Sequence, residues 1–213
     1  KDWIEAHQFR WLIIFGHYLG PLQFISRSLR KIYNIKYKSF YTNLLNFSKN
    51  NPDTFIGKEY SIIIKNLNSI LNNKRHWGDV ISEAGNINWE VDEATCIRLT
   101  NNKDKFYSEI RKFVTESFDT KFDNNLIDEI FDYQKYRLHD PNINYPIRKK
   151  FKYNIHNILE NNSDIKQENY DLIFNGKNYD SDIFNWSREV LWFGRRIGKY
   201  KTDVSLNLNS KKE

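Results

Sequence analysis

The sequence predicts a mainly α-helical protein, with a small antiparallel β-hairpin or α+β element in the C-terminal third. Apolar residues recur at helical spacing through most of residues 1–145. The segment "HDPNINYP" (139–146) then has prolines at both ends of a six-residue stretch, which a helix does not tolerate. Beyond it, apolar and polar residues alternate, as in half-buried strands. We therefore divide the chain into a helical body, 1–145, and a small α+β appendage, 146–213, within one continuous domain.

The helical body contains seven segments with apolar residues at intervals of three and four. Asp2 is a candidate N-cap of the first, which stops at Gly20-Pro21, and Pro21 suits the first turn of the second. "NNPDT" separates the third segment from the fourth. We predict helices over 2–19, 21–32, 39–49, 54–72, 89–99, 102–118 and 124–138. The segment 74–88, which contains Trp77, has no periodic pattern and is expected to be an irregular loop.

Four patterns define the appendage. Phe151, Tyr153 and Ile155 alternate with polar residues and predict a strand. Asn175-Gly176 lies between β-prone residues, which is typical of a hairpin turn. A helix with Asp180 or Ser181 as its N-cap follows, and the alternating "KYKTDVSLNL" (199–208) predicts a last strand.

The formal net charge is +6, which is compatible with an anionic partner. Lysines on solvated faces give the same value, so the charge alone does not predict binding to nucleic acid. The basic segments "RSLRK" (27–31) and "RKKFK" (148–152) lack the motif context that would make them specific for nucleic acid. We expect both to be solvated faces.

The longest uncharged stretch, residues 11–26, is too short to cross a membrane and contains Gly20-Pro21. We interpret it as a buried pair of helices rather than a membrane-surface helix, and we expect no transmembrane segment. The single cysteine, Cys96, excludes an internal disulfide and fits a reducing, cytoplasmic location. The chain has no signal-peptide pattern and no methionine, so we expect it to be an internal or C-terminal piece of a longer protein.

No catalytic or metal-binding motif emerges. His7 and His17 are turned about 80° from each other on one helix, so a shared metal is not expected. We interpret His17 as a hydrogen-bonded core or pocket histidine. Glu90, Asp92 and Glu93 lie where a helix begins, and the helix dipole favours acidic residues there. Cys96 is expected to be buried and inert, so we assign no catalytic residue, no metal ligand and no cofactor to this chain alone.

The segment "REVLWFGRRIGKYKT" (188–202) holds the other candidate site. Arg188, Trp192 and Arg195 recur at spacings of four and three and would share one side of an α-helix, with Val190 or Leu191 facing the core. An arginine can stack on a tryptophan while its planar fork binds a carboxylate or phosphate. The candidate ligand or docking surface is therefore Arg188, Trp192, Arg195 and Arg196.

The alternative interpretation of this segment is a helix end, in which Arg195 and Arg196 only complement the helix dipole. The same helix would place Phe184 and one edge of Trp192 toward the core. Gly194 would allow a ligand or another chain segment to approach closely, and Gly198 would allow the turn into the last strand.

Three stretches, in this order, resemble one protein family. They are "FGHYLGPLQFISRSL" with "YKSFYTNLL", then "INWEVDEATCIRLTNNKDKFYSEIRKFV", and finally "WSREVLWFGRRIGKY". Together they look like the C-terminal region of B12-binding (cobalamin-dependent) radical SAM proteins. The resemblance extends over nearly all of the chain, although its motifs are aromatic and basic patterns rather than a cluster-binding triad.

The resemblance implies an accessory C-terminal domain that shapes a substrate pocket or docks a partner. In the family, S-adenosylmethionine, a 4Fe-4S cluster and cobalamin are bound by upstream domains of the same polypeptide. This chain lacks the C-x-x-x-C-x-x-C motif and the D-x-H-x-x-G loop, so no catalytic residue carries over. The alternative hypothesis is a stand-alone basic helical protein that binds nucleic acid or a protein partner.

Overall fold

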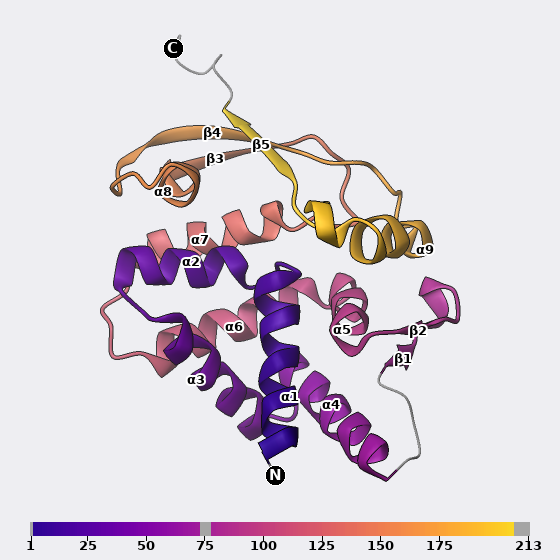
Figure 1. Cartoon of the computed structure of the whole chain (residues 1–213). Helices are drawn as coiled ribbons and strands as arrows, with labels where there is room; N and C mark the ends of the chain where they lie inside the picture. Colours follow the sequence, from indigo (N-terminus) through magenta and orange to yellow (C-terminus); the bar gives the residue numbers. More distant parts are fainter. Residues whose placement is uncertain (1, 73–77, 207–213) are drawn as a thin grey trace. The chain divides into compact units, whose positions relative to one another are not determined.

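The computed structural model describes residues 2–72 and 78–206, and within them the chain is mainly helical with a small antiparallel sheet in its C-terminal part (Figure 1). This confirms the predicted fold class. The chain forms two compact units. The first comprises Lys1–Leu19 and Lys36–Thr120, and the second comprises Gly20–Ile35 and Lys121–Glu213. This division by contacts differs from the division at residue 145, which separates a mainly helical part from a part that contains the three-stranded sheet.

The first unit is a set of helices around an aromatic core. Phe15, Phe40, Phe106 and Phe113 are all fully buried. Phe15 meets Phe106 edge to face at 5.9 Å, and Phe40 meets Phe113 in the same way at 5.7 Å. The first helix continues directly into a π-helical turn. The elements are α1 (Asp2–Ile13), η1 (Ile14–Tyr18), α3 (Tyr37–Asn50), α4 (Phe55–Leu71), β1 (Asp79–Val80), η2 (Ser82–Ala84), β2 (Asn88–Trp89), α5 (Val91–Thr100) and α6 (Lys103–Ser117).

A two-stranded hairpin lies where we predicted an irregular loop. Asp79 pairs with Trp89 and Val80 with Asn88, in antiparallel register, and η2 lies between the strands. Strands of two residues are too short to produce an alternating pattern, which explains why the sequence did not indicate them. The part of the predicted loop that contains Trp77, and His76 beside it, lies outside the described residues.

The second unit combines helices with a three-stranded sheet in the order β3-β4-β5. Its helices α2 and α7 pack side by side, and α7 also contacts β3 (Figure 1). The elements are α2 (Gln23–Tyr33), α7 (Asn124–Arg137), β3 (Ile147–Tyr153), α8 (Ile155–Glu160), β4 (Gln167–Asn175), α9 (Ile183–Trp186), η3 (Ser187–Trp192), η4 (Arg195–Ile197) and β5 (Asp203–Leu206).

One buried glutamine joins α2 to α7. The side-chain oxygen of Gln134 accepts a hydrogen bond of 2.9 Å from the backbone N–H of Phe24. Its amide nitrogen donates to the carbonyl oxygen of Gly20 at 3.0 Å. The first N–H groups of a helix have no acceptor within the helix. No local side chain caps the start of α2, and Gln134 on α7 provides the hydrogen-bond acceptor instead.

The predicted turn at Asn175-Gly176 is wrong. β4 ends at Asn175, and it pairs with β3 and β5 rather than with a strand directly after the glycine. A side chain at Gly176 would approach the Tyr145 ring to 2.9 Å, so close packing explains the glycine. The Asn-Gly signal is a local one, and here tertiary packing decided the outcome.

Two further local predictions need correction. The strand predicted through Ile155 ends at Tyr153, and Ile155 starts α8. The N-cap of α9 is Asp182, whose carboxylate accepts from the backbone N–H of Asn185, instead of Asp180 or Ser181. Those two residues have positive φ angles of 50° and 65° and form the turn before the helix.

The basic segment 27–31 is a solvated face only in part, because Arg30 and Lys31 are exposed whereas Arg27 is half-buried. Ser28 is fully buried, and Arg27 and Lys31 donate hydrogen bonds of 2.5 Å to the carbonyl oxygens of Leu159 and Ile158 near the end of α8. These cations satisfy carbonyl groups that a helix end leaves without partners. In the segment 148–152, by contrast, the basic residues Arg148, Lys150 and Lys152 are exposed on β3.

Across the described ranges, none of the helices has the length and apolar character needed to cross a membrane.

Candidate functional site

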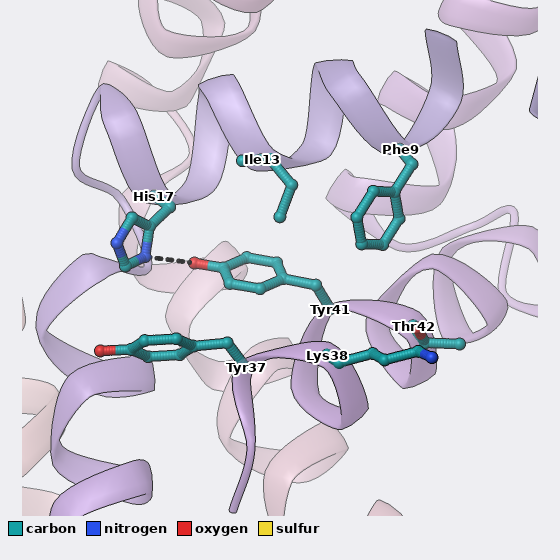
Figure 2. A pocket seen from close by; sticks show the side chains of 7 residues that line it. All are labelled: Phe9, Ile13, His17, Tyr37, Lys38, Tyr41 and Thr42. Atoms are coloured by element: carbon teal, nitrogen blue, oxygen red, sulfur yellow. Dashed lines mark hydrogen bonds between the residues drawn. The ribbon is translucent and has the colours of Figure 1, made fainter. Parts of the chain in front are cut away.

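An apolar pocket of about 430 Å³ lies in the first unit, between the α1–η1 helix and α3 (Figure 2). Its volume falls in the range of small-molecule sites, roughly 300–1,000 Å³. Its walls are mostly aromatic and aliphatic side chains. The lining residues are Phe9, Ile13, His17, Tyr37, Lys38, Tyr41 and Thr42.

Regular helical spacing produces this lining. Phe9, Ile13 and His17 follow one another at intervals of four and therefore lie along one side of their helix. On α3, Tyr41 follows Tyr37 at the same interval. A row of Phe9, Ile13 and His17 therefore faces a row of two tyrosines across the pocket (Figure 2).

His17 lies in the π-helical turn η1. There the backbone N–H of Leu19 donates to the carbonyl oxygen of Ile14 at 2.8 Å, a bond over five residues. The wider turn inserts one residue relative to an α-helix and rotates the side chains that follow it. Single π-turns inside helices frequently occur at functional sites, so this turn marks the His17 end of the pocket.

A hydrogen-bonded polar pair lies at this end of the pocket, whereas Lys38 and Thr42 lie toward the other end (Figure 2). The Nδ1 atom of His17 lies 3.1 Å from the hydroxyl oxygen of Tyr41, within hydrogen-bonding distance. The imidazole also meets the rings of Tyr37 and Tyr41 edge to face, at centroid distances of 5.3 and 6.0 Å. These contacts hold the imidazole in one orientation beside an otherwise apolar wall (Figure 2). The exposed Lys38 adds a positive charge at the α3 side.

This arrangement suits binding rather than bond-making chemistry. Aromatic faces offer large apolar contact areas to a flat ligand, and a few polar groups at one end fix its orientation. Of the lining residues, only His17 was singled out from the sequence, as a core or pocket histidine. Its apposition to Tyr37 and Tyr41 was not predicted, because it depends on how α1 packs against α3.

The second predicted site, in residues 188–196, has a different geometry from the one we expected. Ser187–Trp192 form a π-helix, and Arg195–Ile197 form a 3-10 turn. Arg188 lies over the ring of Phe184, with its Cζ atom 3.6 Å from the ring centroid. Trp192 instead stacks on Phe193, at 5.5 Å and an interplanar angle of 4°. The spacings of four and three assumed an α-helix, and a π-helix turns less per residue.

The exposure of this segment also departs in part from the prediction. Val190 and Leu191 are buried, as expected for its core side. Phe184 and Trp192 are 42% and 47% exposed, and Phe193 is 70% exposed, so these aromatic rings lie at the surface. Arg196 is exposed and Arg195 is half-buried.

The two glycines of the segment serve the local chain. A side chain at Gly194 would overlap the carbonyl oxygen of Glu189 and approach the Cβ atom of Lys199 to 2.6 Å, so the close neighbour is this chain itself. Gly198 has a φ of +76°, a conformation that L-residues rarely adopt, and it turns the chain toward β5.

The acidic residues at 90–93 and Cys96 belong to the interior of the first unit. Glu90 is the N-cap residue of α5, although its side chain makes no capping bond, and Asp92 and Glu93 are buried in the first turn. Burial raises the pKa of the Cys96 thiol well above its usual value, and the nearby carboxylates of Asp92 and Glu93 raise it further. A thiol in that state is a poor nucleophile.

A buried polar network in the first unit was missed by sequence reasoning. Arg98 holds the carboxylate of Glu59 through hydrogen bonds of 2.7 and 2.6 Å. The hydroxyl of Thr95 donates to the same carboxylate at 3.0 Å and accepts from the indole N–H of Trp11 at 3.2 Å. Glu59 lies within an apolar helix sequence, and nothing local in that pattern indicates its partners on α5.

Within residues 2–72 and 78–206, no three His, Cys, Asp or Glu side chains are grouped so that they could hold a metal ion. No protein family model matches the sequence, and no curated protein matches it.

Proposed function

We propose that this chain is an accessory domain of a B12-binding radical SAM enzyme, and that the pocket of its first unit binds the flat, apolar part of a small ligand. The family assignment rests on the three stretches quoted above. The binding role rests on the pocket. The domain would shape the substrate site of the parent enzyme, while the radical chemistry would be performed by upstream domains of the same polypeptide.

The hydrogen bond between His17 and Tyr41 is the observation that carries the binding role. Burying a polar group without a hydrogen-bond partner is costly. His17 and Tyr41 provide one hydrogen bond to each other, and both side chains line the pocket. A ligand that carries one polar group next to an aromatic ring would contact the pair and the apolar wall together. Each 100 Å² of apolar surface removed from water would contribute about 2.5 kcal/mol.

The cofactors of the family do not fit this chain. A 4Fe-4S cluster of the radical SAM type requires three closely spaced cysteines, and this chain has Cys96 alone, which is buried. The proposal therefore assigns the cluster, S-adenosylmethionine and cobalamin to the upstream domains. It also implies a cytoplasmic location and an intramolecular partner.

The pocket is tested by filling it. Thr42 is exposed at the pocket wall on α3, and Ser39 is exposed on the same helix outside the pocket. We expect Thr42→Trp to weaken binding of the aromatic dye anilinonaphthalene sulfonate at least about tenfold. Ser39→Trp is the matched control and should bind as the unaltered chain does. Equal binding by both variants would remove the pocket from the proposal.

The family assignment has its own test, which is the reading frame upstream of Lys1. A C-x-x-x-C-x-x-C motif within the preceding few hundred codons supports it, and a start codon directly upstream contradicts it. This outcome is independent of the dye experiment, so the two parts of the proposal can fail separately.

One observation favours the alternative function, a stand-alone protein that binds nucleic acid. Trp192 and Phe193 stack at the surface, and the exposed Arg196 follows Phe193 by three residues in sequence. Exposed aromatic rings next to cations can stack on single-stranded bases. Salt-dependent binding to a single-stranded oligonucleotide that is lost in Trp192→Ala would support this function. Binding that Trp192→Ala leaves unchanged would count against it.

A further inference from the structure

Three cationic side chains in the second unit gather around one aromatic ring. Phe24, on α2, is almost fully buried. The Cζ atoms of Arg27 and Arg137 lie 5.7 and 4.8 Å from its ring centroid, and the Nζ atom of Lys201 lies 5.7 Å from it. The three residues come from α2, from the end of α7 and from the segment before β5, so the fold brings them together.

One carboxylate accompanies the two arginines. Its oxygen atom, Oε1 of Glu160, lies 3.6 Å from Nη1 of Arg27 and 3.8 Å from Nη2 of Arg137. Charge-assisted hydrogen bonds between such groups are usually about 2.7–2.9 Å. Glu160 therefore offsets part of the positive charge without engaging either guanidinium closely.

Lys201 contributes a further positive charge. In the part of the chain that the structure describes, no side chain or carbonyl group accepts a hydrogen bond from its ammonium group, which contacts the rings of Phe24 and Tyr200. Partial burial lowers the pKa of Lys201, and the charges of Arg137 and Arg27 lower it further. The charges of Arg137 and Arg27 therefore act on Lys201, and the three N–H donors of its ammonium group remain available.

The cluster is both held in place and accessible. Arg27 donates to the carbonyl oxygen of Leu159 at 2.5 Å, and Arg137 donates to the carbonyl oxygen of Thr202. Solvent reaches the site, because the side chains of Arg27 and Glu160 are 25% and 36% exposed. Donors that are fixed before binding lose little conformational freedom when a ligand arrives.

We propose that Arg27, Arg137 and Lys201 form a binding site for a doubly charged tetrahedral oxyanion, namely inorganic phosphate or the phosphoryl group of a small molecule. Three cations beside one carboxylate leave a charge of two to be balanced, which a dianion matches. Guanidinium forks suit the geometry of phosphate oxygens. The site lies in the second unit and does not depend on the pocket of the first.

The test is a titration of the full chain with inorganic phosphate, with chloride at equal ionic strength as the reference. The ring protons of His156 report binding. The charge of Arg137 lowers the pKa of this histidine and also that of Lys201, so an anion bound at these cations changes the field at the His156 ring. We expect a saturable NMR shift and a rise in melting temperature with phosphate but not with chloride. A comparison of the dissociation constants of phenyl phosphate and inorganic phosphate would then show whether the site prefers a phosphoryl ester or the free ion.

Four variants decide the assignment. We expect Lys201→Gln to weaken phosphate binding about tenfold or more, and Lys201→Arg to retain it. Glu160→Gln should strengthen binding several-fold, because it removes the competing carboxylate. Lys150→Gln, an exposed lysine on β3, is the control and should bind normally.

Equal responses to phosphate and chloride would overturn the proposal. So would undiminished binding in Lys201→Gln, or weaker binding in a folded Glu160→Gln. The opposite signs predicted for Lys201→Gln and Glu160→Gln separate a specific site from a general loss of stability, which would weaken binding in both.

Discussion

Glu59 and Arg98 form a largely buried ion pair in the first unit, with side chains that are 4% and 25% exposed. Removing a carboxylate from water is costly, and the pair is stable because two hydrogen bonds from Arg98 and one from Thr95 replace the lost hydration. Such a pair adds little net stability compared with apolar residues, but breaking it leaves an uncompensated charge in the interior.

We therefore predict that Arg98→Leu lowers the free energy of unfolding by roughly 3–5 kcal/mol. Urea denaturation followed by circular dichroism measures it. The control is Lys112→Leu, since Lys112 and Glu116 form an exposed i,i+4 pair. Such pairs contribute only about 0.3–0.5 kcal/mol. A loss below about 1 kcal/mol in Arg98→Leu would show that the Glu59 carboxylate is solvated or protonated instead.

His156 gives a second prediction for a single residue. Burial, and then the charge of Arg137, lowers its pKa below the ordinary value of 6.5, while its Nδ1 atom lies 2.9 Å from the hydroxyl oxygen of Tyr133. In the window between the lowered pKa and 6.5, the unfolded chain binds more protons than the folded one. The stabilisation from the neutral imidazole is therefore complete above pH 6.5 and is lost as the pH falls through this window.

The expected result is that His156→Gln makes the melting temperature less dependent on pH between 7.5 and 5.5 than it is in the unaltered chain. Differential scanning calorimetry at several pH values measures this. His7→Gln is the control, because His7 lies near the start of α1 in the first unit. An unchanged pH dependence in His156→Gln would show that other groups cause it.

At the level of elements, α4 begins at a defined cap. The hydroxyl oxygen of Thr54 accepts from the backbone N–H of Gly57 at 3.0 Å, and the hydroxyl donates to the carbonyl oxygen of Asn51 at 2.7 Å. A side chain at Gly57 would overlap this same carbonyl. The turn before α4 is therefore closed tightly, by a threonine and a glycine in fixed positions.

We predict that Thr54→Ala destabilises the chain by about 1 kcal/mol, the usual effect of losing an N-cap. Thr54→Ser keeps the hydroxyl group, so the free energy of unfolding should fall by only a few tenths of the loss in Thr54→Ala. Thermal and urea unfolding curves for both variants provide the comparison. If serine and alanine cost the same, the methyl group of Thr54 and not its hydroxyl would be the stabilising part.

At the scale of the whole molecule, neither compact unit is one continuous stretch of the chain. Residues 20–35, which include α2, lie between two parts of the first unit in sequence, yet they belong to the second. Phe24 packs edge to face against Tyr133 at 5.7 Å, and Gln134 bonds to the start of α2. Without residues 20–35, Tyr133 would lose its aromatic partner Phe24, and the buried side-chain amide of Gln134 would lose its hydrogen bonds.

It follows that a fragment of residues 121–213 should not unfold cooperatively by itself. Adding a peptide of residues 20–35 should restore a cooperative transition and increase helicity, as measured by circular dichroism. A peptide with Phe24→Ala and Leu29→Ala, two buried residues of α2, is the control and should not restore it. A cooperative transition in the fragment alone would contradict this assignment of α2.

The sequence by itself determined the local features of this protein. The positions of α1 to α7 followed from apolar spacing, the start of α4 followed from "NNPDT" (50–54), and Cys96 was expected to be buried. These signals are local, because helical periodicity and capping act over a few neighbouring residues.

Only the tertiary structure decided what those elements bring together. Phe24 and Gln134 are 110 residues apart in sequence, and Trp11 and Thr95 are 84 apart. The same holds for His17 against Tyr41, and for the three cations around Phe24. No periodic pattern encodes such partners, because they depend on the packing of whole helix faces. The strand pairings were settled in the same way, by hydrogen bonding between separate segments.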